Sequence, residues 1–136
     1  MNVVRSFLRW VLALFFIAAG TNHFRVPEIY LGMMPSWVPS PSLVNSIVGM
    51  AEFAGGLGLI FAPTRRLAGW CLILLLIAVF PANVHVALLG KTPGYDIPAF
   101  VLWLRLPLQA VLIAWTWWTA VMRTRHEERV GHWSSH

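Results

Sequence analysis

Long apolar stretches, separated by short polar joints, fill most of this chain. They cover residues 3–24, 44–61, 67–89 and 98–122. Each is close to the roughly 20 residues that an α-helix needs to cross about 30 Å of hydrocarbon. The pattern predicts an all-α integral membrane four-helix bundle over residues 1–122 and a polar tail over residues 123–136.

The composition supports a membrane protein. Of the 136 residues, 58% are hydrophobic and 11% are charged, which excludes both a disordered chain and an ordinary soluble domain. The net charge of +5 comes from basic residues at the ends of the predicted helices, so nucleic acid is not an expected partner. The single cysteine, Cys71, excludes an internal disulfide and is expected to be a small buried hydrophobe.

Basic residues divide unequally between the two ends of the predicted bundle. Arg25 and Lys91 fall in the joints at one end. At the other end lie Arg5, Arg9, Arg65, Arg66, Arg123, Arg125 and Arg129. The positive-inside rule therefore predicts that both termini, and the tail, are cytoplasmic. A cleavable signal peptide is the alternative explanation for the first stretch, which begins with basic residues and has a short apolar run.

Residues 25–41 form a long joint on the predicted outer side. The joint holds four prolines, so it cannot be one uninterrupted helix, yet it is too apolar for a solvated linker. Two interpretations stand equally: a lid over a cavity, or an amphipathic connector seated among lipid headgroups.

Two charged residues stand out inside the apolar stretches, where an unpaired charge is costly. Glu52 lies roughly 12 Å below the outer end of the second stretch, and Arg105 lies roughly 10 Å below the same end of the fourth. Gly49 and Gly56 share the helical face of Glu52 and would let a neighbouring backbone come close. We therefore expect Glu52 to point into the bundle at the depth of Arg105.

Other polar side chains gather in the same outward half of the bundle. His23 continues a helix-interface stripe of the first stretch, and Gln109 shares the face of Arg105. Asn83 and His85 lie about 200° apart on a helix, so only one is expected to face a cavity, and Asn83 is favoured. The candidate ligand-binding residues are His23, Glu52, Asn83, His85, Arg105 and Gln109.

This cluster has two interpretations. In one, Glu52 and Arg105 form a buried ion pair that fixes the helix register, supported by amide hydrogen bonds. In the other, the cluster lines an outward-facing pocket, where Arg105 would bind a carbonyl, a quinone oxygen or an anion and Glu52 and His23 would exchange protons. A metal site is not expected, because no His-x-x-x-His or His-x-x-Glu pair occurs on one helix face and Arg105 would repel a cation.

Several fragments, in this order, resemble the DoxX family of small four-span membrane proteins. They are AGTNHFRVPEIYLGMMPSWVP, GMAEFAGGLGLIFAPTRRLAGW, FPANVHVAL and RLPLQAVLIAW. The resemblance covers roughly residues 7–118 and implies a compact four-helix bundle in the bacterial cytoplasmic membrane. Members of that family are often tied to redox systems, including a quinone-linked one.

The resemblance and the polar cluster together predict a redox-associated accessory protein. It would bind a small amphipathic or quinone-like ligand, or a partner subunit, in the outward-facing pocket. A quinone-linked membrane oxidoreductase subunit and a small-molecule exporter are the alternatives, so whether the protein is an enzyme stays open. Besides the lipid bilayer, the partners considered are a membrane or redox subunit and a second copy of the chain.

Overall fold

The computed structural model describes residues 3–91 and 96–122, and this part of the chain is helical with no β-strand. The predicted tail, with Arg123, Arg125 and Arg129, lies outside the described residues. The elements are α1 (Val3–Arg25), α2 (Pro27–Met33), α3 (Pro41–Ile60), α4 (Arg65–Leu89) and α5 (Ala99–Thr116), which continues into a π-helix, η1 (Trp117–Val121).

Four helical segments are long and apolar enough to cross a membrane: α1, α3, α4 and α5 together with η1. They confirm the four predicted long helices, with bounds that differ from the expected ones by a few residues. Many large apolar side chains on these helices are exposed on the outside of the bundle, among them Leu74, Phe80 and Trp103. Such a surface is expected of helices that contact lipid instead of water.

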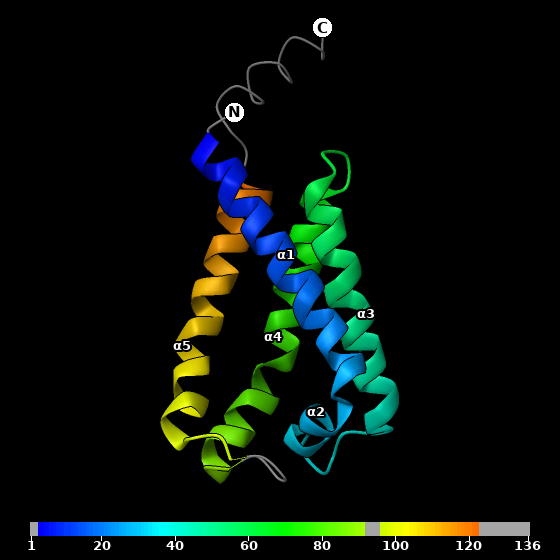
Figure 1. Cartoon of the computed structure of the whole chain (residues 1–136), viewed down its shortest axis with the longest axis vertical. Coiled ribbons are helices and arrows are strands. Elements are labelled where there is room, and N and C mark those ends of the chain that lie inside the picture. The colour runs from blue at the N-terminus through cyan, green and yellow to red at the C-terminus, as the bar shows by residue number, and fades with distance from the viewer. Residues whose placement is uncertain (1–2, 92–95, 123–136) are drawn as a thin grey trace, which may run out of the picture.

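The long helices alternate in direction (Figure 1). α1 and α4 run from the end that holds the N-terminus towards the end that holds α2, and α3 and α5 run back. We call these ends of the bundle the terminal end and the α2 end. α3 packs against α1 and α4, and α5 packs against α4. This order decides which polar side chains can meet.

α1 and α3 approach each other closely because glycines line their contact. A Cβ on Gly20 would lie 2.6 Å from the carbonyl oxygen of Gly49 and 2.6 Å from the backbone nitrogen of Phe53. A Cβ on Gly56 would lie 2.8 Å from the carbonyl oxygen of Ala13. The backbones therefore touch where side chains would otherwise separate them, as is common between helices in membranes. The close approach brings His23 and Glu52 within reach of each other.

Two apolar clusters fill the bundle. The larger lies between α1, α3 and α4 and includes Leu12, Phe16, Leu59 and Leu72, all of them almost fully buried. The smaller, around Met33, joins α2 to α4 and α5 at the α2 end. Cys71 belongs to neither, because its side chain is exposed on α4. The prediction that it would be buried is wrong: this face of α4 points away from the other helices.

The joint over residues 25–41 is folded under the bundle instead of running as one helix. α1 ends at Arg25, Val26 adopts a non-helical conformation, and Pro27 begins the short helix α2. A turn closed by the Val38 amide donating to the Pro35 carbonyl, at 3.1 Å, follows α2. The joint thereby places the side chains of α2 and of this turn beneath the four long helices.

Arginines at the terminal end bind the carbonyl oxygens that helix C-termini leave without partners. Arg5 donates to the Met122 carbonyl and Arg9 to the Thr119 carbonyl, at 3.5 Å. Arg65 donates from Nε to the Leu59 carbonyl at 3.2 Å. The basic residues that intrude into the first span are therefore buried and bonded to the end of the fourth.

Candidate functional site

A cavity of about 640 Å³ opens among the helices in the half of the bundle nearest α2. Its wall is mostly apolar and includes side chains of all five helices and of the joint before α3. The polar or ionisable side chains in the wall are Asn22, His23, Arg25, Tyr30, Glu52, Asn83, Arg105 and Gln109. Its size and lining are those of a site for a small molecule.

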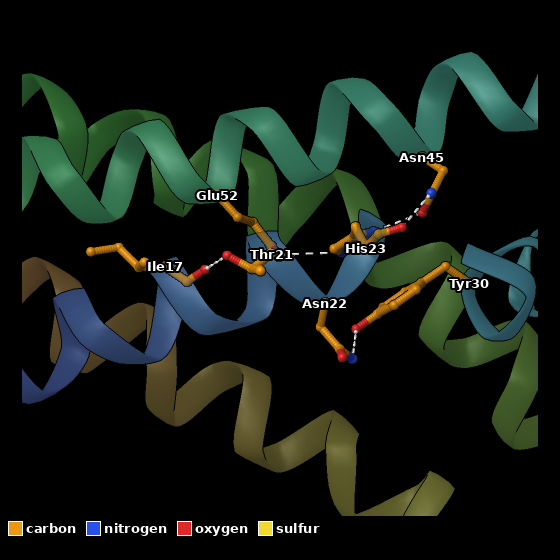
Figure 2. A network of polar contacts seen from close by, with 7 residues as sticks. All are labelled: Ile17, Thr21, Asn22, His23, Tyr30, Asn45 and Glu52. Carbon is orange, nitrogen blue, oxygen red and sulfur yellow. Dashed lines mark hydrogen bonds and ion pairs between the residues drawn. The ribbon is translucent and has the colours of Figure 1, made fainter. Parts of the chain in front are cut away.

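His23 lies at the centre of a network between α1 and α3 (Figure 2). Its Nδ1 is 2.8 Å from Oδ1 of Asn45, and its Nε2 is 3.3 Å from Oε2 of Glu52. The His23 and Glu52 side chains are only 9% and 12% exposed. Each ring nitrogen thus faces an oxygen from a different turn of α3.

The Asn45 amide decides which atom of the imidazole carries a proton. Nδ2 of Asn45 donates to the backbone carbonyl of His23 at 3.0 Å, and this carbonyl can only accept. Oδ1 of Asn45 therefore faces the ring, so Nδ1 of His23 must be the donor of that bond. Nε2 then faces the Glu52 carboxyl, and a protonated imidazole at this distance forms an ion pair with a carboxylate.

A second contact holds the His23 ring from its face. The Tyr30 ring stacks on it with centroids 3.7 Å apart and an interplanar angle of 21°. The Tyr30 hydroxyl accepts a hydrogen bond from Nδ2 of Asn22 at 2.8 Å. α2 thus clamps the imidazole against α3, and the orientation of His23 is fixed by three elements.

The predicted ion pair between Glu52 and Arg105 does not form. Glu52 pairs with His23 instead, while Nη1 of Arg105 donates to Sδ of Met33 at 3.4 Å. The prediction matched the depths of the two residues along their helices. It failed because α3 packs against α1 and α4, whereas α5, which holds Arg105, packs against α4.

Arg105 and Glu52 nevertheless line the same cavity. A thioether sulfur is a weak acceptor, and a guanidinium has five N–H donors. Within residues 3–91 and 96–122, the bond to Met33 is the only hydrogen bond that the structure gives the Arg105 side chain. Most of its donors are therefore available to a molecule in the cavity.

Asn83 and Gln109 join α4 to α5 across the cavity wall. Nδ2 of Asn83 donates to Oε1 of Gln109 at 2.6 Å, and Nε2 of Gln109 donates to the Leu76 carbonyl. Leu76 lies in the turn of α4 that precedes Pro81, where the proline removes one backbone donor. Asn83 faces the cavity, whereas His85 is half-buried and is not among the residues that line it.

Three residues of the site have no place in the sequence prediction. Asn45 lies seven residues before Glu52, on the same helical stripe as Gly49, so its position carried a signal. No sequence pattern marked Tyr30 or Met33 as a site residue, because only the fold of the joint brings α2 beneath the bundle.

The described part of the chain holds no group of three or more His, Cys, Asp or Glu side chains that could bind a metal ion.

The fold and the site together define a helical protein with four candidate membrane spans around a ligand-sized cavity. Residues 12–120 match the model of a domain of unknown function, DUF8561, and the chain belongs to that family. The match includes every residue of the site. No curated protein and no solved structure matches the chain. The resemblance to the DoxX family stays a prediction.

Proposed function

We propose that this chain is a multi-pass protein of the bacterial cytoplasmic membrane that binds a small amphipathic or quinone-like molecule in the cavity between its helices. The cavity supplies apolar walls for the hydrophobic part of the ligand, and Arg105 supplies donors for its oxygen atoms. A role as an accessory protein of a redox system rests on the resemblance to the DoxX family. A partner subunit could then deliver or receive the ligand.

The observation that carries the proposal is the state of Arg105. Its side chain is half-buried, lines the cavity and is bonded only to the thioether of Met33 within the described residues. A thioether is a weak acceptor, so most of the guanidinium donors have no strong partner within the protein. An oxygen-bearing ligand would accept charge-assisted hydrogen bonds from them.

A binding measurement tests this. In a non-ionic detergent, we expect the purified chain to bind decylubiquinone in a calorimetric titration, and Arg105→Met to weaken binding about tenfold or more. Arg66→Met is the matched control, because Arg66 is exposed and is not part of the cavity wall. No binding to the unmodified chain would overturn the proposal for quinone-like ligands, and equal binding to Arg105→Met would remove Arg105 as the anchor.

The proposed orientation places both termini in the cytoplasm and the cavity in the outer half of the membrane. It is supported by Arg5, Arg9, Arg65 and Arg66 at the terminal end of the bundle, against Arg25 and Lys91 at the α2 end.

Cysteine labelling tests the orientation. In a Cys71→Ala background, a membrane-impermeant maleimide should label Ser36→Cys from outside intact cells. It should label Ala62→Cys, in the joint between α3 and α4, only after lysis. Both wild-type positions are exposed. The reverse labelling pattern would invert the proposed topology.

A proton-coupled exporter is the second candidate. The observation that favours it is that Glu52 lines the cavity while its buried Oε2 contacts His23 without the alignment of a hydrogen bond. Such a carboxyl could exchange its proton when the cavity fills. Efflux of a lipophilic cation from proteoliposomes, driven by a pH gradient and lost in Glu52→Gln, would favour this function over simple binding.

A further inference from the structure

We propose that the ligand of this cavity is a single-chain amphiphile with an anionic headgroup, a long-chain carboxylate, held by the guanidinium of Arg105. This rests on the proposed function and narrows it, because a quinone is neutral and a carboxylate is not. Three features of the cavity lead to it: the balance of charge in its wall, the acceptors already in use around Arg105, and its volume.

The charges in the cavity wall do not cancel. Its ionisable side chains are His23, Arg25, Tyr30, Glu52 and Arg105. Glu52 faces His23 as its ion-pair partner, and the Tyr30 hydroxyl accepts from the Asn22 amide. Arg25 and Arg105 remain as cations, and both are always protonated in proteins. Arg25 is exposed, whereas Arg105 is half-buried against the cavity. The cavity therefore carries an excess of positive charge at Arg105 that an anion would balance.

Two polar side chains that share the cavity wall with Arg105 already have other partners. Gln109, one turn further along α5, accepts from Asn83 through Oε1 and donates to the Leu76 carbonyl through Nε2. Glu52 lies on a helix that packs against α1 and α4, and it contacts His23. The guanidinium of Arg105 therefore keeps a set of parallel N–H donors whose geometry fits the two oxygens of a carboxylate.

A neutral oxygen is a poorer partner for this site. A carbonyl accepts one or two hydrogen bonds but leaves the positive charge of Arg105 uncompensated in surroundings of low dielectric constant, where charge matters more than in water. A carboxylate satisfies the donors and the charge together, and such charge-assisted bonds are roughly twice as strong as neutral ones. The affinity should therefore depend on the charge of the headgroup.

The volume of the cavity indicates the size of the hydrophobic part of the ligand. A cavity of about 640 Å³ holds on the order of twenty atoms the size of a water molecule, at about 30 Å³ each. That is enough for a carboxyl group and one alkyl chain. Apolar side chains suited to an alkyl chain line the wall, among them Phe15, Phe16, Val79, Leu108 and Leu112.

The test compares ligands that differ only in the charge of the headgroup. Hexadecanoate and hexadecanol are titrated into the full chain in dodecyl maltoside at pH 7.5, with decylubiquinone measured beside them. We expect hexadecanoate to bind about tenfold or more tightly than hexadecanol. Arg105→Gln should abolish this difference, and Arg66→Gln should preserve it. Arg105→Lys keeps the positive charge but loses the planar guanidinium with its parallel N–H donors. It should therefore retain only part of the preference for hexadecanoate over hexadecanol.

The outcomes separate this inference from the proposed function. If hexadecanol or decylubiquinone binds as tightly as hexadecanoate, the anionic headgroup is wrong and the cavity remains an amphiphile site. If none of the three binds, both proposals fall. If Arg105→Gln keeps the preference for hexadecanoate while its circular dichroism matches that of the unmodified chain, Arg105 is not the anchor.

Discussion

The contact between His23 and Glu52 should contribute measurably to the stability of the bundle, and a double-mutant cycle can isolate its energy. His23→Phe keeps an aromatic ring to stack on Tyr30 but removes both ring nitrogens. Glu52→Met keeps the length of the side chain but removes the carboxyl. Together the two variants delete both sides of the contact without opening a large space.

The structure sets the size of the effect. For opposite unit charges 3.3 Å apart, an effective dielectric constant of about 20 gives roughly 5 kcal/mol of attraction before desolvation is counted. Desolvation removes most of this for buried pairs, and polar contacts between membrane helices average about 0.6 kcal/mol with a maximum near 1.7. We therefore expect each single variant to lose about 2 kcal/mol and the coupling energy to be about 1–2 kcal/mol.

The assay is equilibrium unfolding in mixed micelles of increasing dodecyl sulfate content, followed by far-ultraviolet circular dichroism. A parallel cycle with Glu52→Met and Arg105→Met is the control, because each of these side chains contacts a different partner, His23 and Met33. It should be additive within about 0.5 kcal/mol. Additivity for His23 and Glu52, or coupling above 1 kcal/mol for Glu52 and Arg105, would refute the pairing described here.

Three further variants can be measured in the same unfolding assay. Gly20→Ala should lower the free energy of unfolding by about 1–3 kcal/mol, because its Cβ would lie 2.6 Å from two backbone atoms of α3 and force the helices apart. Its control is Ala54→Val, on an exposed face of α3, which should change the free energy of unfolding by less than about 0.5 kcal/mol. Asn83→Leu should cost about 1–2 kcal/mol by leaving Oε1 of Gln109 without its donor, and no loss would mean that this bond contributes nothing. Arg65→Met should cost about 1 kcal/mol, because the last carbonyls of α3 lose their cationic donor; an unchanged midpoint would argue that other groups satisfy them.

The number of long apolar helices and their order could be predicted from the sequence because each is encoded locally. A run of about 20 apolar residues is visible without any knowledge of its neighbours, and the prolines after Arg25 show where a helix must break. The glycines around Glu52 likewise marked the face on which another helix comes close, and that face contacts α1. These signals depend on spacing within one segment.

The partners of the site residues could not be predicted in the same way. Depth along a helix follows from counting residues, but which helix lies beside which depends on packing over the whole bundle. Glu52 and Arg105 were matched by depth alone, whereas the Glu52 helix lies against α1 and takes its partner from there. The role of Tyr30 depends on α2 folding beneath the bundle, and a seven-residue helix leaves little trace in an apolar pattern.

The arginines described here fall into two groups according to the acceptors that their side chains contact. One group contributes to the stability of the bundle, and the other is expected to contribute to ligand binding. Arg5, Arg9 and Arg65 donate to carbonyl oxygens at helix ends, so their bonds hold the bundle together. Arg105 faces the cavity with a thioether as its one acceptor in the described residues. Replacing an arginine of the first kind removes a bond that exists in the empty protein and should lower its stability. Replacing Arg105 removes mainly donors that a ligand would use, so it should change affinity far more than stability.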